Sequence, residues 1–450
     1  GGDGVLAPVL SRHAESLGAD WSLTSAGQTY RLIGTFVLSN VSGDSQAIAR
    51  LQRSSARYFQ RPDRGGGANG LFSDRYDTSA TGLRGFGGYL RASRDQGLWQ
   101  WEAMVNYRSP GFEVNDIAFL QRADYVWMAA NLARQQTRPG RWYRTLGLIW
   151  GAQQQYNFSG DRTDLEFHAR AEAQFRNYWR ATLLTWYRPA VLDDAMTRGG
   201  AAVRRAWNWV LLPKLSTDPR ARAALTLRPG YRRWGDASEM WSLSATARWR
   251  PATNVELQLG PSFTAMTDRG QYVVQFADPS ATAFFGRRAV FGAMQQRTLS
   301  ISTRVGWTFT PALSLELYAQ PFVSTGRFSD FQEYVRPRSG RRALFDSAQI
   351  AVSARDEAGR PLRYRLDPDR DPSTADFEFG NPDFSLRSLR GNAVLRWEYH
   401  PGSTLFFVWQ QERSGDGLPG DFDLGRDVGG VFRQRPDNVF VVKASYWIGR

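Results

Sequence analysis

The sequence predicts an all-β protein whose strands form a transmembrane antiparallel β-barrel. Three observations lead to this prediction. Segments of about ten residues alternate between apolar and polar side chains, aromatic residues make up 14% of the chain, and the mean hydropathy is only −0.47. Successive side chains of a strand point to opposite faces, so a period of two means one apolar and one polar face. In a barrel the apolar face meets lipid and the polar face lines the lumen.

The clearest alternation lies in Thr253–Ala265, where Val255 and Leu257 share one face and Glu256 and Gln258 share the other. The same pattern recurs along the rest of the chain. It predicts further strands at Leu17–Thr24, Leu165–Arg176, Thr298–Phe309, Ala312–Val323, Ser388–Tyr399 and Asn438–Ile448.

Turn-forming residues separate these strands into hairpins. Short connections are expected at Ser25–Gln28, Ser93–Gly97, Thr137–Gly140, Arg176–Asn177, Thr217–Arg220, Arg250–Asn254, Thr310–Pro311 and His400–Ser403. Longer, more polar connections are expected at Ser42–Thr81, Ser109–Gln121, Asn157–Thr163, Val191–Gly200, Met266–Phe285, Gly326–Phe384 and Glu412–Pro436. Alternation of short and long connections is typical of a barrel with short periplasmic turns and long outer loops.

The strand count is about 17, whereas single-chain bacterial barrels have even numbers of strands. Residues 1–16 are therefore expected to be an outer loop or a truncated first strand. If Gly4–His13 is itself a strand, the total is 18. The chain opens Gly-Gly-Asp-Gly with no Met and no signal peptide, so we expect a mature or trimmed product that begins inside the barrel. Residues 17–450 are expected to form the barrel as a single domain.

A soluble β-sandwich or propeller is the alternative interpretation of the same pattern. Its Leu, Val and Phe faces would form a core, and its charged faces would be the surface. Regular hairpins along the whole chain, with no helical stretch and no linker, favour a single closed sheet. A bundle of membrane helices is excluded, because no segment approaches the ~18–20 apolar residues that a spanning helix needs.

The net charge of +14 comes almost entirely from arginine, since only Lys214 and Lys443 are lysines. The arginines are spread along alternating strands and are not clustered on a helix or arm, so nucleic-acid binding is not expected. Arginines on polar strand faces would line a pore, and those in loops would meet anionic lipopolysaccharide or substrates. The chain has no cysteine, which excludes disulfides and thiolate metal sites. No cofactor is expected.

Four stretches support a family resemblance. They are PGFEVNDIAFLQRAD at Pro110–Asp124, LDDAMTRGG at Leu192–Gly200, NPDFSLRSLRGNAVLRWEY at Asn381–Tyr399, followed by HPGSTLFFVWQQ, and the terminal RPDNVFVVKASYW. In order and spacing they resemble the outer-membrane barrel region of a large bacterial family of unknown function. Members of that family typically carry an N-terminal module like a family-9 carbohydrate-binding domain, and further strands precede the barrel region. This chain lacks the module and those strands, which agrees with the odd strand count.

Charged residues on the polar strand faces are the first candidate site. The expected lumen-lining residues are Arg170, Arg176, Arg228, Arg248, Arg304, Arg390, Arg396, Glu102, Glu166, Glu172, Glu256, Glu316 and Glu398. One interpretation is a charged conduit that orients a polar or anionic solute, as charged rings do in channels. The other is a self-paired ladder of Arg–Glu bonds that fills the interior, since opposite charges on neighbouring strands pair readily.

Pro110–Asp124 is too apolar for an exposed loop and is expected to fold into the barrel mouth. Residues 110–121 would then form a plug or constriction, with Phe112, Asn115, Asp116 and Phe119 as its main side chains. The alternative is a turn that packs against its own hairpin.

One loop is crowded with acidic residues, namely Asp367, Asp369, Asp371, Asp376 and Glu378. Oxygen ligands at this density make Asp367, Asp369 and Asp371 a weak candidate site for Ca²⁺. The spacing is not that of an EF-hand and proline interrupts it. A solvated acidic loop beside the basic run Arg336–Arg342 is the favoured interpretation.

Catalysis is not expected. Of the three histidines, His13 lies near the start, His400 lies in a turn, and only His168 points into the lumen. No serine stands two residues from His168 on its face, and no GxSxG elbow is present. Paired lumen carboxylates such as Glu166 and Glu172 would be the candidates for acid–base chemistry of the kind a hydrolase needs.

The sequence therefore predicts an integral outer-membrane protein in contact with lipid and lipopolysaccharide. Its expected role is a channel or conduit for polar or anionic solutes, with oligosaccharides suggested by the companion module of the family. The alternative is a plugged barrel that serves as a membrane anchor or scaffold. In that case the long outer loops Ser42–Thr81 and Gly326–Phe384 would bind partner proteins or surface glycans.

Overall fold

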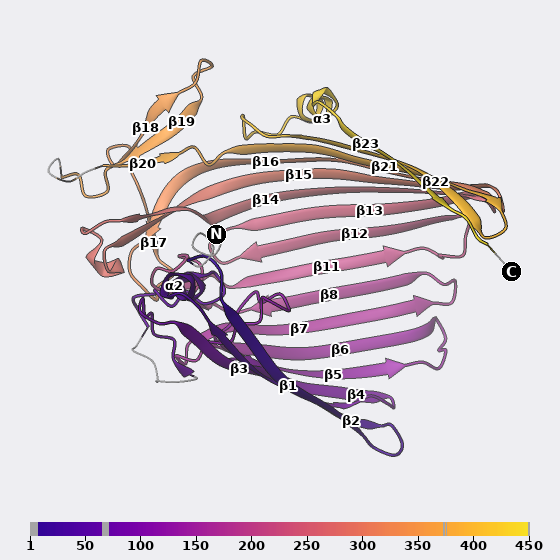
Figure 1. Cartoon of the computed structure of the whole chain (residues 1–450), viewed down its shortest axis with the longest axis horizontal. Coiled ribbons are helices and arrows are strands. Elements are labelled where there is room, and N and C mark those ends of the chain that lie inside the picture. Colours follow the sequence, from indigo (N-terminus) through magenta and orange to yellow (C-terminus); the bar gives the residue numbers. More distant parts are fainter. Residues whose placement is uncertain (1–7, 65–71, 372–373, 375, 449–450) are drawn as a thin grey trace.

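The computed structural model describes residues 8–64, 72–371, 374 and 376–448. Within them, an eighteen-stranded antiparallel sheet curls into a barrel-like wall (Figure 1). The strands of the wall are β1 (His13–Thr24), β2 (Tyr30–Ser42), β3 (Gly82–Arg94), β4 (Trp99–Arg108), β5 (Tyr125–Gln136), β6 (Tyr143–Tyr156), β7 (Arg162–Phe175), β8 (Arg180–Arg188), β11 (Asn208–Ser216), β12 (Ala223–Trp234), β13 (Glu239–Ala252), β14 (Val255–Ala277), β15 (Arg287–Thr310), β16 (Leu313–Tyr334), β17 (Arg342–Leu344), β21 (Phe384–His400), β22 (Ser403–Gly415) and β23 (Asp437–Ser445). The predicted fold class, an all-β antiparallel barrel, is confirmed.

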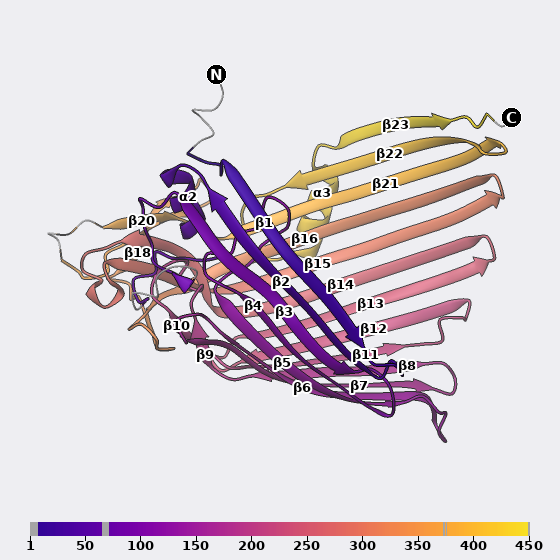
Figure 2. The ribbon, with the colours of Figure 1, turned by 60° about the horizontal axis from the view of Figure 1, so that its bottom comes forward.

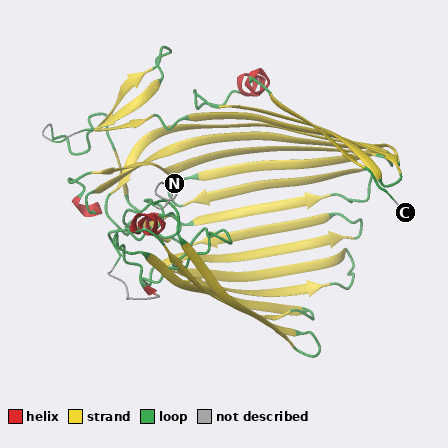
Figure 3. Ribbon diagram, in the orientation of Figure 1, coloured by secondary structure: helices red, strands yellow, loops and turns green. Residues whose placement is uncertain are grey.

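The connections at one end of the wall carry the remaining elements (Figure 3). These are α2 (Ser45–Arg53), β9 (Val191–Asp193), β10 (Val203–Arg205), the 3₁₀ helix η2 (Thr282–Phe284), β18 (Ile350–Arg355), β19 (Pro361–Leu366), β20 (Phe377–Gly380) and α3 (Leu424–Arg433). Strands β18 to β20 form a small separate sheet, and β9 and β10 form a hairpin. No helix among the described residues is long and apolar enough to cross a bilayer.

The strand register separates an apolar outer face from a polar inner face. Across β13, β14 and β15, Leu243 pairs with Phe263 and Phe263 with Leu299. One position along, Ser244 pairs with Ser262 on the opposite face. The apolar row is exposed: Leu243 has 54% of its surface accessible. Large apolar side chains exposed on this outer face include Trp101, Leu132, Trp150, Phe167, Leu183, Leu259 and Trp307. This arrangement suits lipid outside and water inside.

The predicted short connections are confirmed. All eight join consecutive strands of the wall, because glycine, proline, aspartate and asparagine specify tight turns locally. The predicted loop Met266–Phe285 is wrong, since β14 runs on to Ala277 and only residues 278–286 connect it to β15. The alternation of apolar and polar residues weakens in this part of β14 because other connections cover both faces of the extended hairpin. Neither face there is exposed to lipid alone or to the lumen alone.

The expectation of no helical stretch is also wrong. Helix α2 begins after Asp44, whose side chain accepts a hydrogen bond from the Gln46 backbone N–H. Helix α3 begins after Asp423, which caps Arg426 in the same way. Both are single short helices within long polar connections, where their apolar faces are too brief to dominate the pattern.

At the start of the chain, β1 begins at His13, four residues before the predicted strand. Of the candidate strand Gly4–His13, residues 4–7 lie outside the described part of the chain, and Pro8–Leu10 form a turn. Strand β1 pairs only with β2 and β23 only with β22, so these two strands are the edges of the wall (Figure 2).

Small apolar cores lie at the loop end of the wall and not along its length. One contains Val41, Ile48, Phe59 and Leu83, which pack α2 against the inner face of β2 and β3. A second comprises Val290, Phe331, Phe345, Leu366 and Phe379, and it joins the β18–β20 sheet to the extended ends of β15 and β16. These cores tie the long connections to the barrel mouth.

The assignment of faces predicts the cost of placing a charge on each side of one strand. We expect Leu243→Arg, on the lipid face of β13, to lower the free energy of unfolding in lipid vesicles by about 2–4 kcal/mol. Ser244→Arg, on the adjacent inner-face position, should cost well under half of that because its guanidinium stays in water. Guanidinium chloride titration of the refolded variants measures both. Equal costs would contradict the orientation of the wall.

Candidate functional site

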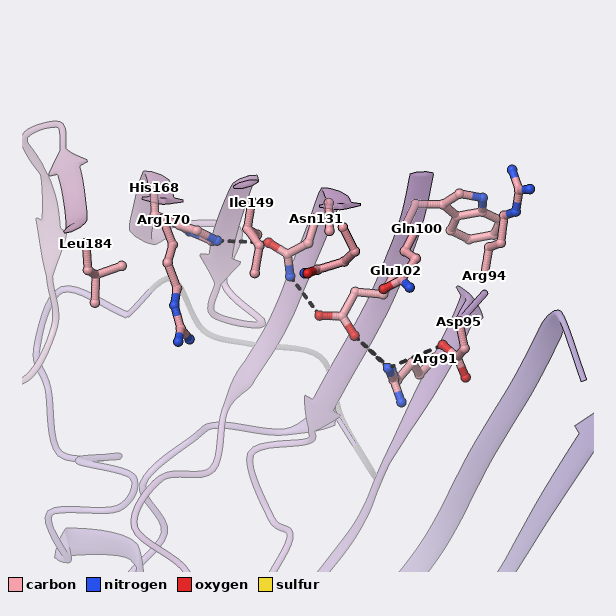
Figure 4. Close-up of a pocket in the computed structure, with 13 residues that line it drawn as sticks. Arg91, Arg94, Asp95, Gln100, Glu102, Asn131, Ile149, His168, Arg170 and Leu184 are labelled. Atoms are coloured by element: carbon pink, nitrogen blue, oxygen red, sulfur yellow. Dashed lines mark hydrogen bonds and ion pairs between the residues drawn. The ribbon is translucent and has the colours of Figure 1, made fainter. Parts of the chain in front are cut away.

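A chain of polar contacts runs across the inner face of β3 to β7 (Figure 4). Arg91 Nε donates to Glu102 Oε2 at 2.9 Å, and Asn131 Nδ2 donates to Glu102 Oε1 at 2.9 Å. His168 Nε2 lies 2.8 Å from Asn131 Oδ1, and His168 Nδ1 lies 3.2 Å from Glu166 Oε1. Four strands thus contribute to one connected row of hydrogen bonds and ion pairs on the inner wall.

The row continues toward β10. Arg188 lies 2.6 Å from Glu166 and 3.9 Å from Asp164, and Arg205 lies 3.2 Å from Asp164 and 3.8 Å from Asp193. We call the whole set the luminal ladder. Its members are Arg91, Glu102, Asn131, His168, Glu166, Arg188, Asp164 and Arg205.

Gly151 on β6 makes the central contact of the ladder possible. It stands between Asn131 on β5 and His168 on β7 in the strand register. A Cβ atom at this position would lie 1.9 Å from Asn131 Oδ1 and 2.4 Å from His168 Nε2. Only glycine leaves room for side chains two strands apart to meet over the intervening strand.

A cavity of about 360 Å³ adjoins the ladder. Its polar lining includes Arg91, Glu102, His168 and Arg170 from the inner face, together with Arg94 and Asp95 at the end of β3 (Figure 4). Three arginines against two carboxylates, Asp95 and Glu102, leave this cavity with a small excess of positive charge.

The predicted lumen-lining residues share one face of the sheet, the face opposite to Leu243 and Phe263. Their strands are β4 for Glu102, β7 for Glu166, Arg170 and Glu172, β12 for Arg228, β13 for Arg248, β14 for Glu256, β15 for Arg304, β16 for Glu316, and β21 for Arg390, Arg396 and Glu398.

Arg176 departs from the prediction, because it follows β7 in the turn and its guanidinium donates to Gly140 O at 3.0 and 3.2 Å. Arg248 lies near the same end and donates to Pro219 O.

Some of these residues pair with one another and others do not. Pairs form between Arg170 and Glu172, between Arg390 and Glu412 at 3.4 Å, and between Arg396 and Glu398 at 3.1 Å. Within the described part of the chain, Arg228 and Arg304 form no ion pair. Arg304 lies over the Tyr318 ring, 5.3 Å from its centroid, beside a cavity of about 380 Å³. The inner wall is therefore partly self-paired and partly basic.

The mouth of the barrel holds a second set of charges, and these are buried. Arg57, after α2, lies 2.8 Å from Glu113 in the β4–β5 connection, and neither side chain is more than 2% exposed. The Arg57 guanidinium also donates to the backbone carbonyls of Pro110 and Phe112. Burial lowers the pKa of Arg57 below its ordinary value, although Glu113 opposes the shift. This pair ties the β2–β3 connection to the β4–β5 connection.

Two buried aspartates extend the set. Asp194 lies 2.7 Å from Arg122 and 3.2 Å from Arg61, while Asp124 lies 2.7 Å from Arg64. Burial alone would raise the pKa of Asp194, but Arg122 and Arg61 outweigh it and hold the pKa below its ordinary value. At Asp124 burial dominates over Arg64, and the pKa is raised. We call these residues the mouth cluster, which comprises Arg57, Arg61, Arg64, Glu113, Arg122, Asp124 and Asp194.

The β8–β11 connection brings opposite sides of the wall together over the mouth. The Ala202 backbone N–H donates to Asp63 Oδ2 at 2.8 Å, on the side of β2 and β3. The Arg338 backbone N–H donates to Ala202 O at 2.7 Å, on the side of β16. Arg338 also forms an ion pair with Asp161 in the β6–β7 connection. These contacts cross the mouth from several connections, and the apolar cluster of Val203, Phe291 and Tyr334 packs beside them.

The predicted plug segment lies at the mouth, but its side chains do not all act as expected. Phe112 is 5% exposed and packs on the inner face of β3, where Gly85 and Gly87 leave room for its backbone and ring. Asn115 folds the segment locally by accepting from the Leu120 N–H. Asp116 is exposed, and Phe119 is 84% exposed, so the expectation that this ring is covered is wrong. Although exposed, the ring borders a cavity whose lining also includes Tyr125 and Trp127 of β5.

The described residues of the acidic loop hold one another in local hydrogen bonds. Asp369 Oδ1 accepts from Thr374 Oγ1 at 3.0 Å, and Asp367 Oδ1 accepts from the Arg370 N–H at 2.8 Å. Among the residues that the structure describes, no group of three acidic or histidine side chains is arranged to hold a metal ion. Asp376 and Glu378 pair with Arg365 and Arg363 of β19 and not with the basic run Arg336–Arg342.

Most of the mouth cluster and five of the eight residues of the ladder were not predicted from the sequence. Arg91, Asn131 and Arg188 stand on the polar phase of their strands, so strict alternation over β3, β5 and β8 would have found them. The mouth cluster lies in irregular connections, where no period marks the side chains that become buried.

Comparison with known proteins identifies a family for almost the whole chain. The model of a family described as a domain of unknown function (DUF5916) matches residues 9–449. No protein of curated function matches the sequence. A ferric enterobactin receptor (PfeA) in complex with BCV-L6 is similar in structure, with a TM-score of 0.40, 10% identity, and coverage of 98% of this chain and 72% of that chain. The siderophore receptor PirA from Acinetobacter baumannii has a TM-score of 0.42 and 8% identity, covering 96% and 70%.

Gly151→Ala tests the central contact of the luminal ladder. The added Cβ would overlap Asn131 and His168, so we expect their hydrogen bond to break and the free energy of unfolding to fall by about 1–3 kcal/mol. Gly147→Ala is the matched control on the same face of β6, because its Cβ would meet only the flexible end of Gln135 at 3.0 Å. Denaturant titration compares the two variants. Equal losses would mean that the ladder contact is not specific.

Asp194→Asn tests the mouth cluster and its pH dependence. The folded pKa of Asp194 lies below the ordinary 3.8, so its stabilisation is fully present above pH 3.8 and is lost as the pH falls through the folded value. At pH 7 we expect the variant to lose about 3 kcal/mol of local stability. Hydrogen exchange of mouth amides measures this loss, and the difference from wild type should shrink below pH 3.8. The exposed Asp116→Asn is the control. A pH-independent difference would contradict the assignment.

Proposed function

This chain belongs to the DUF5916 family, whose description assigns no function, and from its geometry we propose that it conducts polar or anionic solutes across the outer membrane. Solutes would pass through a basic lumen whose mouth is gated by the long connections. The apolar outer face would contact lipid, and arginines outside the bilayer would contact lipopolysaccharide phosphates.

The observation that carries the proposal is the imbalance of charge on the inner wall. Glu102, Glu166, Glu172 and Glu398 each lie within ion-pair distance of a basic side chain. Within the described residues, Arg228 and Arg304 have no such partner, and of the six glutamates predicted to line the lumen only Glu316 lacks a basic one. Guanidinium groups without carboxylate partners would attract anions and orient carboxylate or phosphate groups by bidentate hydrogen bonds.

The mouth cluster supports gating and not a permanent seal. Burial of Arg57 and Glu113 costs a desolvation penalty that offsets much of their attraction, so buried pairs stabilise a closed state only modestly. Buried ion pairs are better suited to defining one arrangement than to adding stability. Separation of the β2–β3 and β4–β5 connections would hydrate both charges and open the lumen.

Below the mouth, a cavity of about 340 Å³ combines aromatic and basic side chains. Its lining includes Phe119, Tyr125, Trp127, Arg108 and Arg122. Aromatic rings with nearby polar groups suit solutes that have both apolar and hydrogen-bonding surfaces. We therefore include oligosaccharides among the proposed solutes, and acidic oligosaccharides fit the basic residues best.

We propose no catalytic step. Glu166 is held between Arg188 and His168, and Glu172 between Arg170 and Arg180. Both carboxylates are therefore already engaged with neighbouring side chains of the inner wall.

A second candidate function is a membrane anchor. The β18–β20 sheet extends beyond the wall in Figure 1, and contacts between connections cross the mouth. A permanently closed barrel that presents this sheet to partner proteins or glycans would account for both features.

Single-channel recording in planar bilayers distinguishes the two functions. For the conduit we expect anion-preferring conductance from the wild type, with more frequent openings in Asp194→Asn. Arg304→Ser combined with Arg396→Ser should reduce the anion preference severalfold, because the field at the wall weakens. Glu316→Ser, beside Arg304, is the control of opposite charge and should increase it. Silent bilayers from folded wild type and folded Asp194→Asn would favour the anchor.

A further inference from the structure

The end of the inner wall that carries the short turns contains a further cavity. It has a volume of about 290 Å³ and is lined by residues of β7, β8 and β11 to β14 and of the turns after β7 and β11. Its cationic lining residues are Arg180, Lys214 and Arg248, and among the described residues no carboxylate lines it. It therefore differs from the cavity beside the luminal ladder, where two carboxylates offset three arginines.

Short hydroxyl side chains form the floor of this cavity. Ser216 of β11 pairs with Thr226 of β12, which in turn pairs with Thr246 of β13. Directly paired residues of antiparallel strands share a face. These three residues lie on the inner face, because their neighbours Leu215 and Leu225 are exposed on the outer face. A row of short side chains leaves a hollow between the longer side chains of the neighbouring rows.

The three cations border this floor on different sides. Lys214 lies two residues before Ser216 in β11, and strand alternation places it on the same inner face. Arg248 lies two residues after Thr246 in β13, also on that face. Because β11 and β13 are both antiparallel to β12, Lys214 stands on the interior side of the floor and Arg248 on the side of the turns. Arg180, which pairs with Ser216, borders the cavity from β8.

Two of these three positive charges have no counter-charge. Arg180 Nε lies 3.6 Å from Glu172 Oε1, so its charge is partly offset. Within the part of the chain that the structure describes, neither Lys214 nor Arg248 forms an ion pair. The Arg248 guanidinium donates to Pro219 O, but its Nε atom is buried and has no hydrogen-bond acceptor among the described residues. Both side chains therefore retain donors for a ligand.

The turns beside the cavity do not supply the missing negative charge. Asp218, the acidic residue of the β11–β12 turn, is held by Arg220 at 2.8 Å. Arg144 and Arg220 both lie over the ring of Tyr178, with guanidinium carbons 4.2 and 3.2 Å from its centroid. Tyr178 itself lines the cavity. The electrostatic potential over the floor is therefore positive, which raises the local concentration of anions.

The number of free charges favours one class of anion. A phosphate monoester carries about −1.5 to −2 at pH 7 and has three strong acceptor oxygens, whereas a carboxylate carries a single charge on two oxygens. Two unpaired cations and a row of hydroxyl donors match the phosphate better. The volume of about 290 Å³ is close to the lower limit of about 300 Å³ for small-molecule sites. Such a site suits a phosphate group with one small organic group attached.

We propose that this cavity binds the phosphate group of a small phosphate monoester, of the size of a sugar phosphate. Lys214 and Arg248 neutralise the phosphate from opposite sides, and the hydroxyls of Ser216 and Thr226 donate to its oxygens. The inference rests on the proposed function in treating this monoester as a solute that passes along the wall, whereas binding itself needs no conduction. Because the site is on the inner face, its ligand is a free solute and not a lipid headgroup.

Isothermal titration calorimetry of the refolded full chain tests the site, in an uncharged detergent that contains neither phosphate nor sugar. The probes are glucose 6-phosphate, glucuronate and glucose, which have similar sugar rings and differ in the group at the sixth carbon. We expect glucose 6-phosphate to bind about tenfold more tightly than glucuronate, because it makes additional charge-assisted hydrogen bonds. Glucose should show no measurable binding.

Variants of the lining locate the binding. Lys214→Gln and Arg248→Gln should each weaken binding of glucose 6-phosphate about tenfold, because each removes a hydrogen bond to a charged group. Thr226→Val keeps the shape of the floor but removes one hydroxyl, and it should weaken binding severalfold, which a diffuse positive field would not explain. Lys443→Gln is the matched control, since Lys443 is the other lysine of the chain and lies on β23, away from the cavity. It should change the Kd by less than about twofold, because distant exposed charges are screened.

Three results would overturn the proposal. They are equal affinities for glucuronate and glucose 6-phosphate, unchanged affinity in both Lys214→Gln and Arg248→Gln, and displacement of glucose 6-phosphate by phosphatidylglycerol added to the micelles. The last would place a lipid headgroup in the site. Absence of binding by a wild type that gives anion-preferring conductance would contradict this site alone, whereas binding by a wild type with silent bilayers would support the site and contradict the conduit. Heat-modifiable migration on gels verifies that each variant has folded before titration.

Discussion

The structure depends on one constraint, which is that backbone polar groups inside a bilayer need partners within the protein. A row of antiparallel strands satisfies them from β2 to β22, and this pairing imposes the alternation of lipid-facing and lumen-facing side chains. The outer face carries Leu243 and Phe263, which are paired across neighbouring strands. The inner face carries the pair Ser244 and Ser262 at the next position.

The inner wall and the mouth use charge in different ways. On the wall, arginines and glutamates pair partly exposed to water, and their contribution per pair is small. In the mouth, Arg57 and Glu113 are buried, so each charge needs the other to offset the cost of its desolvation. In the conduit that we propose, charge on the wall defines an environment for solutes, whereas charge in the mouth holds connections together. A conduit with a separable gate requires both.

Much of the wall could be predicted from local signals. Tight turns such as Thr310–Pro311 depend on a few adjacent residues, and each predicted short turn joins the expected strands. The errors occur where local signals weaken. Met266–Phe285 is mostly strand because β14 and β15 extend into the mouth, where other connections cover both faces. The helix after Asp44 is short, and its apolar face matters only because Val41 and Leu83 lie beneath it.

The sequence alone determined the fold class and the face on which each wall residue lies, because a period of two is a property of neighbouring residues. Tertiary structure decided which of those residues meet. Asn131 and His168 are in contact only because register places Gly151 between them, and Asp194 reaches Arg61 and Arg122 only because three connections fold over one mouth. Such contacts join residues distant in the chain, and no local pattern specifies them.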